Sequence, residues 1–393
     1  MKNLILTPML LLVSASLCAQ TQDFWIQRAE FGGGDCLGAF GFSISNKGYV
    51  GCGNFWEYDP LLDSWSQKAD FEGGYRMDPV GFSIGNKGYM GTGRDDYVRK
   101  DFWEYDPLLN SWTQLADFGG VARAEAVGFS IGNKGYIGTG YDADSHNLKD
   151  FWEYDPDLNN WIQKTDFLSV AYGAVGFSIG GKGYMGTGNK NSGLQKGFAE
   201  YDPVTDIWIK KADFGGTARV QAVGFSIGTK GYLGTGSNNG AGYNDFWEYD
   251  PALNTWTQKV DFGGIARSQA VGFSIGNKGY LGTGAILSGA PTSDFWEYTP
   301  EFGVGISSIT IDDGIFSLFP NPNDGMITIT ATFGQEETLT IRIIDLTGRE
   351  LFSEIIGNVT GTFSKQLDLG NYSSGTYFMQ LIHDGQKEVH KMQ

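Results

Sequence analysis

The feature that most constrains the fold is a hexapeptide, Phe-Trp-Glu-Tyr-Asp-Pro, that recurs in six near-identical copies. The copies begin at Phe55, Phe102, Phe151, Phe198, Phe246 and Phe295. Successive starts are 47, 49, 47, 48 and 49 residues apart. A period this long and this constant indicates repeated supersecondary units that stack on their neighbours. We therefore expect one repetitive domain over most of the chain.

Each unit reads as four strands. In the fifth unit Val223, Phe225 and Ile227 alternate with Gly224 and Ser226, which is the period of two of a strand. The Gly-Thr-Lys-Gly segment that follows can reverse the chain, because glycine tolerates positive φ. The hexapeptide and a later tryptophan segment form a second hairpin. Two hairpins per unit predict a four-stranded antiparallel sheet.

This pattern resembles the kelch repeat over roughly residues 22–300. The resemblance rests on glycines after the second strand and on the Tyr-Asp-Pro to Trp interval between the third and fourth strands. The paired glycines appear here as Gly-Thr-Gly, and Ala199 replaces tryptophan in unit four. The resemblance implies an all-β fold, a six-bladed β-propeller over residues 20–300.

The tryptophans predict how the ring closes. The fourth-strand tryptophans are Trp25, Trp65, Trp112, Trp161, Trp208 and Trp256. No such residue follows the last hexapeptide, whereas Trp25 precedes every other element. We therefore expect the segment Phe24–Phe31 to add the missing outer strand beside Phe295–Tyr298. Closure of this kind protects sheet edges that would otherwise pair with other chains.

Composition and the N-terminus indicate export. Residues 1–19 resemble a signal peptide, with Lys2 before the largely apolar run Leu4–Val13 and with Ala19 as the small residue before the cleavage point. That run is too short to span a membrane, and no transmembrane segment is expected. The formal net charge is −17, which argues against a nucleic-acid partner because phosphate binding needs clustered Lys and Arg.

Two cysteines remain after the signal peptide, Cys36 and Cys52. An exported protein can form disulfides, so a bond between them is one alternative. Antiparallel pairing about the Asn46-Lys47 turn is expected to place Cys52 opposite Gly41 and not opposite Cys36. We therefore favour two unpaired thiols.

The C-terminal region has different motifs. Residues 301–313 form a candidate linker, and residues 314–393 carry Pro320-Asn321-Pro322, a turn around Gly348, Gly375-Thr376-Tyr377 and a terminal Lys391. This region resembles the type A C-terminal sorting domain of type IX secretion. The resemblance implies a small immunoglobulin-like β-sandwich, the type IX secretion machinery as a partner, and a protein that is secreted or displayed on the outer-membrane surface of a Gram-negative bacterium. We expect a monomer.

The candidate ligand site lies on the face with the variable loops. The loops between second and third strands differ among units, and propeller geometry places them beside the connections between blades. The connections carry a repeated arginine, five residues before the inner-strand glycine. The candidate ligand-binding residues of the channel mouth are Arg76, Arg123, Tyr172, Arg219 and Arg267, with Cys36 and Tyr172 taking the arginine place in the other two units.

Such an arginine ring could hold carboxylate or sulfate groups by forked hydrogen bonds. The favoured alternative is structural, with each arginine paired to a local acid such as Asp70, Asp117, Asp213 or Asp261. The hexapeptide glutamates Glu57, Glu153 and Glu248 each have a lysine 11 residues later. These pairs are expected to form cross-strand contacts.

No cofactor, metal or catalytic residue is expected. Asp142, Asp144 and Ser145, or Asp95 with Asp96, offer incomplete calcium ligand sets. The favoured function is a secreted or surface-displayed, non-enzymatic propeller that binds a glycan or a protein through its variable loops. The first alternative is an enzyme similar to kelch sugar mutarotases or epimerases, which would need an asymmetric acid at the mouth. A structural surface or adhesion role is the second alternative.

Overall fold

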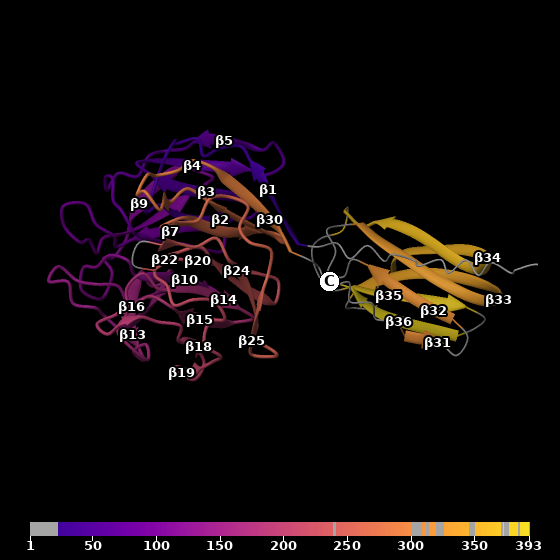
Figure 1. Cartoon of the computed structure of the whole chain (residues 1–393). Coiled ribbons are helices and arrows are strands. Elements are labelled where there is room, and N and C mark those ends of the chain that lie inside the picture. The colour runs from indigo at the N-terminus through magenta and orange to yellow at the C-terminus, as the bar shows by residue number, and fades with distance from the viewer. Residues whose placement is uncertain are drawn as a thin grey trace, which may run out of the picture.

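The computed structural model describes residues 23–238, 241–300, 309–311, 314–319, 326–345, 350–370, 372, 377–383 and 386–392. The predicted signal peptide, the Pro-Asn-Pro motif and most of the predicted linker lie outside these ranges. Figure 1 shows a ring of sheets and a separate body of C-terminal strands. Among the described residues, no helix is long and apolar enough to cross a lipid bilayer.

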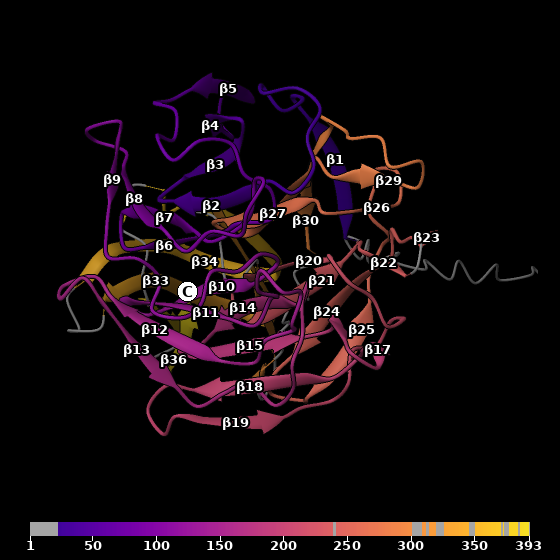
Figure 2. The ribbon, with the colours of Figure 1, turned by 90° about the vertical axis from the view of Figure 1, so that its left-hand side faces the viewer.

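Residues 23–238 and 241–300 form a six-bladed β-propeller, because six four-stranded antiparallel sheets surround one axis (Figure 2). Blade 1 contains β2 (Phe40–Ile44), β3 (Lys47–Cys52), β4 (Asn54–Asp59) and β5 (Ser64–Gln67). Blade 2 contains β6 (Val80–Ile84), β7 (Lys87–Gly91), β8 (Phe102–Asp106) and β9 (Ser111–Gln114). Blade 3 contains β10 (Val127–Ile131), β11 (Lys134–Gly138), β12 (Phe151–Asp155) and β13 (Asn160–Lys164).

Blade 4 contains β14 (Val175–Ile179), β15 (Lys182–Gly186), β18 (Phe198–Asp202) and β19 (Ile207–Lys210). Blade 5 contains β20 (Val223–Ile227), β21 (Lys230–Gly234), β24 (Phe246–Asp250) and β25 (Thr255–Gln258). Blade 6 contains β27 (Val271–Ile275), β28 (Lys278–Gly282), β30 (Phe295–Thr299) and β1 (Phe24–Arg28). The first strands of neighbouring blades contact one another around the axis, including β27 with β2.

The predicted closure by the N-terminal strand is confirmed. β1 pairs antiparallel with β30, and Trp25 lies opposite Tyr298. The Trp25 ring packs edge-on against Phe246 of blade 5, with ring centroids 5.0 Å apart. Asp23 is buried and accepts hydrogen bonds from the Tyr298 hydroxyl at 2.9 Å and the Val260 amide at 3.0 Å. The chain start therefore completes the last blade in both its sheet and its core.

The hexapeptide builds the contacts between blades. Its phenylalanine packs edge-on against the tyrosine of the next blade's hexapeptide, as in Phe55 with Tyr105, whose ring centroids lie 4.7 Å apart. The same contact joins the last blade to the first, between Phe295 and Tyr58 at 5.0 Å. Apolar burial of this kind is the main favourable term in the stability of the ring.

The predicted cross-strand pairs are confirmed. Lys68 lies 3.2 Å from Glu57, and the pairs Lys164–Glu153 and Lys259–Glu248 each lie at 3.8 Å. Each glutamate also accepts a hydrogen bond from a tyrosine hydroxyl of the second strand, as Glu57 does from Tyr49 at 2.6 Å. The hexapeptide acids are therefore structural.

Short strand pairs occur in the variable loops and connections. They are β16 (Asn189–Lys190), β17 (Gly193–Leu194), β22 (Ser237–Asn238), β23 (Ala241–Gly242), β26 (Arg267–Ser268) and β29 (Ala285–Ile286). β26 belongs to the connection into blade 6 and pairs with β29 of that blade's loop. Single bridges repeat this arrangement between Ala124 and Tyr141 and between Tyr172 and Asn189. Variable loops and connections therefore lie side by side on one face, as the sequence predicts.

The C-terminal strands are β31 (Ile309–Ile311), β32 (Gly314–Phe319), β33 (Met326–Asp345), β34 (Glu350–Asp368), β35 (Tyr377–His383) and β36 (Gln386–Met392). β31 lies within the segment expected to be linker. The first part of β33 pairs with β32 and the second part with β35, and its pairing with β34 shifts register between Phe333 and Glu337. Ile327, Ile341 and Met379 share one buried cluster, so both parts of β33 contribute to a single core.

Candidate functional site at the channel mouth

Six equivalent residues form a ring around the propeller axis, three positions before the inner-strand glycine of each unit. We call them the mouth ring: Gly38, Asp78, Glu125, Gly173, Gln221 and Gln269. All six have positive φ, between 51° and 66°. Four of them are not glycine, and this conformation costs such residues free energy. Backbone strain of this kind is often found at functional sites.

A closed cycle of backbone hydrogen bonds holds the mouth ring. The amide of each member donates to the carbonyl of the preceding member, and Gly38 donates to Gln269 at 3.1 Å to complete the cycle. The six distances lie between 2.8 and 3.3 Å. Since the backbone is fixed in this way, the side chains of the ring are aimed by the scaffold and not by mobile loops.

The side chains of the mouth ring form two acid–amide pairs. Gln221 Nε2 donates to Glu125 Oε1 at 3.0 Å, and Gln269 Nε2 donates to Asp78 Oδ1 at 3.0 Å. The two glycines leave room for the acids, because a Cβ on Gly173 would lie 2.9 Å from Glu125 Oε2 and one on Gly38 would lie 2.9 Å from Asp78 Oδ1. The ring surrounds a cavity of about 120 Å³.

The two carboxyl groups are perturbed by their surroundings. Burial, with a smaller contribution from the negative charge of Asp78, raises the pKa of Glu125 to about 7. Burial also raises the pKa of Asp78, although Gln269 and Arg94 oppose the shift. Arg94 Nη2 lies 3.5 Å from Asp78 Oδ2. Glu125 Oε2 is buried without a hydrogen-bond partner. The mouth therefore holds two inequivalent acids, of which Glu125 has a pKa close to neutral pH.

Two tyrosines extend the site from the ring onto the loop face. Tyr141 and Tyr172 pack edge to face with centroids 5.8 Å apart. The Tyr172 hydroxyl accepts a hydrogen bond from Asn189 Nδ2 at 2.9 Å. Tyr172 immediately precedes Gly173 of the mouth ring. The Tyr141 pKa is raised, first by burial and then by the charge of Glu125. Of the predicted site residues, only Tyr172 lies beside this mouth.

The predicted arginines do not line the mouth. Arg123, Arg219 and Arg267 are fully buried, and Arg76 is 7% exposed. Arg123 donates to both oxygens of Asp150, at 2.8 and 2.6 Å, and to the Thr139 carbonyl at 2.9 Å. The carboxylate partners are Asp101, Asp150, Asp245 and Asp294. The hypothesis of a ligand-binding arginine ring at the mouth is wrong. The favoured structural alternative is right in kind, but the partner acids differ from those named from the sequence.

Each of these arginines belongs to a repeated group that we call the arginine cluster. It consists of the arginine, the aspartate just before the hexapeptide, and the hexapeptide tryptophan. In blade 3, Trp152 Nε1 donates to Asp150 Oδ2 at 2.8 Å, and the Arg123 guanidinium lies 4.7 Å from the centre of the Phe118 ring. Burial is the largest influence on Asp150 and opposes its ionisation, but the hydrogen bonds and charge of Arg123 and the hydrogen bond from Trp152 together outweigh burial and lower the pKa. The same cluster occurs in blades 2, 5 and 6.

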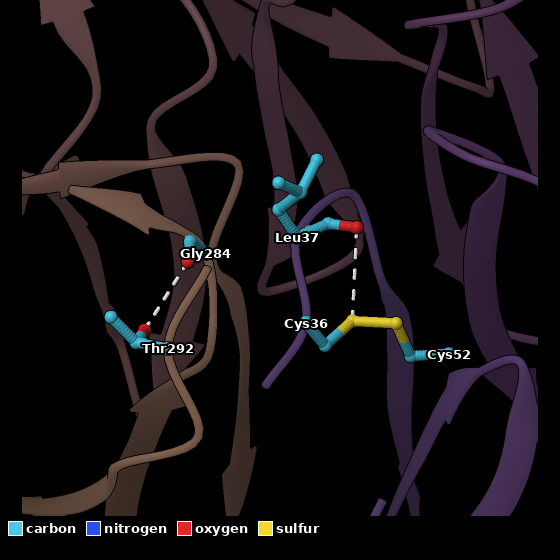
Figure 3. The surroundings of a disulfide bond; sticks show 5 residues. All are labelled: Cys36, Leu37, Cys52, Gly284 and Thr292. Carbon is cyan, nitrogen blue, oxygen red and sulfur yellow. Dashed lines mark hydrogen bonds between the residues drawn. A yellow bond between two sulfur atoms is a disulfide. The ribbon is translucent and has the colours of Figure 1, made fainter. Parts of the chain in front are cut away.

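Blade 1 replaces the arginine cluster with a disulfide. Cys36 stands at the arginine position and is bonded to Cys52, with Cα atoms 6.4 Å apart (Figure 3). The expectation of two free thiols is wrong because its register was wrong. Gly41 pairs with Val50, so Cys52 lies beyond Gly51 and its partner Phe40, nearer the connection that carries Cys36. The Cys36 carbonyl also accepts from Gly284 of blade 6 at 2.7 Å.

The mouth acids are the functional candidates that sequence reasoning missed. The expectation followed the position five residues before the inner-strand glycine, which is nearly uniform. The position three residues before it varies as Gly, Asp, Glu, Gly, Gln and Gln. Variation at one position of an otherwise constant repeat was the signal. Only two of the six units supply an acid at this position, Asp78 and Glu125.

In the part of the chain that the structure describes, one cluster of side chains could hold a metal ion, and it lies in the variable loop of blade 3. Oxygen or nitrogen atoms of Asp142, Asp144 and His146 lie within 4.8 Å of one another. His146 Nδ1 lies 3.2 Å from Asp142 Oδ2, and both Asp144 and His146 are exposed. Asp142 also accepts backbone hydrogen bonds from Asp144 and His146, which is the role of a loop-stabilising residue.

Comparison with known proteins identifies the C-terminal region. The family model described as a secretion system C-terminal sorting domain matches residues 317–393. The chain ends in a type IX sorting domain. This domain indicates handling by the type IX secretion system and secretion or attachment at the cell surface. The match covers the C-terminal region and does not concern what the propeller binds.

The propeller is similar to a solved structure titled "Structure of YjhT". The TM-score is 0.60 at 17% sequence identity, and the match covers 67% of this chain and 95% of that chain. At this identity the likeness concerns the fold. No curated protein matches the chain.

Proposed function

We propose that the protein is a secreted or surface-displayed binding propeller that recognises a neutral or amine-bearing glycan at its channel mouth. The observation that carries the proposal is the mouth ring, with two acid–amide pairs around a cavity of about 120 Å³. Carboxylate and amide groups can accept from and donate to neighbouring sugar hydroxyls, while Tyr141 and Tyr172 offer aromatic surface. Binding sites typically combine a few oriented polar groups with a preformed cavity.

The charge of the mouth selects among glycans. Asp78 would repel a carboxylated or sulfated sugar, and so would Glu125 once it is deprotonated above a pH of about 7. The four repeat arginines that could have attracted such a sugar are buried. Arg94 is the cation beside Asp78, and it already lies 3.5 Å from that carboxylate. The anionic ligand considered from sequence is therefore disfavoured, and a neutral or cationic sugar is favoured.

The test is calorimetric titration of the purified chain with oligosaccharides of glucose, glucosamine and galacturonic acid. We expect saturable binding of the glucose or glucosamine oligomer and none of the galacturonic acid oligomer. Gln221→Gly and Gln269→Gly should weaken binding, and glycine fits these backbone positions because Gly38 and Gly173 occupy them in other units. The matched control is Glu72→Gln, which changes an exposed connection residue away from the mouth cavity.

Preference for the acidic oligomer, or unchanged affinity in both glutamine variants, would contradict the mouth as the glycan site. Absence of binding to all three oligomers would favour a protein ligand on the variable loops.

A second candidate is a carbohydrate-active enzyme of the mutarotase or epimerase type. One observation favours it, the raised pKa of Glu125, about 7, beside Asp78. A general acid or base works best when its pKa is near the working pH. The test follows anomeric exchange of the bound sugar by NMR. An enzyme should accelerate exchange, and Glu125→Gln should abolish the acceleration while binding persists.

A further inference from the structure

Blade 4 lacks all three members of the arginine cluster. Ala171 stands at the arginine position, Gly197 at the aspartate position and Ala199 at the tryptophan position. The Tyr172 named from sequence as the arginine equivalent is therefore one residue too late. The register is set by the backbone, since Gly140 donates to the Ala171 carbonyl as Gly188 does to that of Arg219. No disulfide replaces the cluster here, because both bonded cysteines lie in blade 1.

The loss leaves a cavity of about 360 Å³ at this site, within the size range of small-molecule sites. Its walls include Phe167, Phe198 and Ala199, all at least nine-tenths buried, and the backbone of Gly197. Phe167 is the counterpart of Phe118, the ring beneath the guanidinium in blade 3. The cavity therefore presents aromatic and apolar surface where the other blades hold an indole ring and an ion pair.

The residues that follow Phe167 along the chain also differ from their counterparts in blade 3. In blade 3 the phenylalanine is followed by Gly119 and Gly120, where a Cβ would lie 2.7 Å from Trp152 and 2.7 Å from Arg123 respectively. The second position is also glycine in blade 2, where a Cβ on Gly73 would lie 2.8 Å from Arg76, so the guanidinium leaves no room for a side chain there. In blade 4, Phe167 is followed by Leu168 and Ser169, and both line the cavity. The connection has thus been rebuilt around the space, as expected for a retained cavity and not for a single damaging substitution.

The rim of the cavity is positively charged. Lys190, Lys196 and Lys210 line it together with one acid, Asp213, which lies 3.4 Å from Lys210. Lys196 is the counterpart of Lys100 and Lys149, which pair with Asp117 and Asp166 in their own blades. Among the described residues, neither Lys190 nor Lys196 forms an ion pair with a carboxylate. This local excess of positive charge stands out on a chain of net charge −17.

Lys210 is specific to blade 4. It lies directly opposite Ala199 in the β18–β19 pair. The residues opposite the hexapeptide tryptophan in the other blades are Gln27, Gln67, Gln114, Gln163 and Gln258. The exchange of tryptophan and glutamine for alanine and lysine therefore opens the cavity and adds a cation to the same position.

We propose that the blade 4 cavity binds a small ligand that carries an aromatic ring and a carboxylate. The ring occupies the place of the missing tryptophan against Phe167 and Phe198. The carboxylate accepts charge-assisted hydrogen bonds from the rim lysines. This site is separate from the channel mouth and does not depend on the function proposed for it. A free aromatic acid and the C-terminal aromatic residue of a peptide share this chemistry.

The test uses three probes that share one ring, namely indole-3-acetate, indole and tryptamine, titrated into the purified chain by calorimetry. We expect indole-3-acetate to bind at one site, indole to bind more weakly and tryptamine not to bind. Lys210→Gln, which restores the residue of the other five blades, should weaken indole-3-acetate roughly three- to fivefold and leave indole unchanged. Ala199→Trp should abolish binding of both. A peptide with a C-terminal tryptophan, compared with its amide, separates the two sources.

Lys100→Gln is the control, because Lys100 is the counterpart of the rim residue Lys196 in a blade that has its tryptophan. It should change nothing. The proposal is overturned if indole-3-acetate does not saturate, if tryptamine binds equally well, or if Lys210→Gln leaves the affinity for indole-3-acetate unchanged. The last result decides the matter even where Ala199→Trp fails to fold.

Discussion

The raised pKa of Glu125 makes a quantitative prediction about stability. The pKa rises from 4.5 in an unperturbed side chain to about 7 in the folded protein. The folded state therefore holds this proton more tightly than the unfolded state. The resulting stabilisation is complete below the unfolded value and is lost as the pH rises from 4.5 through about 7. A shift of this size corresponds to about 3 kcal/mol, at roughly 1.4 kcal/mol per pH unit.

The perturbation is Glu125→Gln, which keeps the size of the side chain and removes its titration. Between about pH 4 and about pH 8, the native protein should lose about 3 kcal/mol of unfolding free energy relative to this variant. Comparing the two proteins cancels the titration of all other groups. Because Asp78 contributes to the shift, Asp78→Asn should lower the Glu125 pKa and reduce the difference.

Urea unfolding followed by tryptophan fluorescence measures this free energy for the propeller alone. All 11 tryptophans lie between Trp25 and Trp296, so the sorting domain does not contribute. The control is Glu72→Gln, an exposed acid that should behave as the native protein does. If the native protein and Glu125→Gln show the same pH dependence, the account of a buried, protonated Glu125 is refuted.

Three further predictions concern the scaffold. Deleting residues 20–31 should expose the edge of β30 and reduce solubility or melting temperature, and an unaffected truncation would disprove closure by the N-terminus. Trp25→Ala alone should cost about 3–5 kcal/mol in urea unfolding, because it empties a site between three aromatic rings. Asp150→Asn should cost about 3–5 kcal/mol by leaving Arg123 buried without a carboxylate, whereas exposed Asp213→Asn should cost less than about 1 kcal/mol. Replacing Cys36 and Cys52 by serine should lower stability by about 3 kcal/mol, as expected for a loop with a sequence separation of 16, and reductant should then have no further effect; equal melting of the native protein with and without reductant would contradict this.

The sequence predicted the scaffold well because the scaffold is local and repeated. A strand shows its alternation within five residues, and a hairpin shows its turn glycines beside it. Because the same pattern occurs in six copies, each strand and turn assignment is supported six times. The closing strand was also predictable, because a missing tryptophan at one end and an extra Trp25 at the other can be counted.

The site was less predictable, and the arginines illustrate why. Arg123 and Asp150 are 27 residues apart, and nothing in the spacing says which of several nearby acids the guanidinium meets. An arginine repeated at one position of each unit predicts a ring of arginines, but the repeat does not show whether their side chains face the channel or are buried within the blades. In this protein the blades bury them, since each guanidinium fills the space between a phenylalanine and an aspartate.

By itself the sequence determined the architecture and the address: six blades, closed by the chain's own start, followed by a sorting domain. These follow from periodicity and from motifs that are contiguous along the chain. Only the tertiary structure decided which charges are buried in pairs, which acids face the channel, and that blade 4 encloses a cavity with a lysine rim. Burial, pairing and empty space arise from contacts between residues far apart in the chain, and the free energy of a charge depends on those contacts.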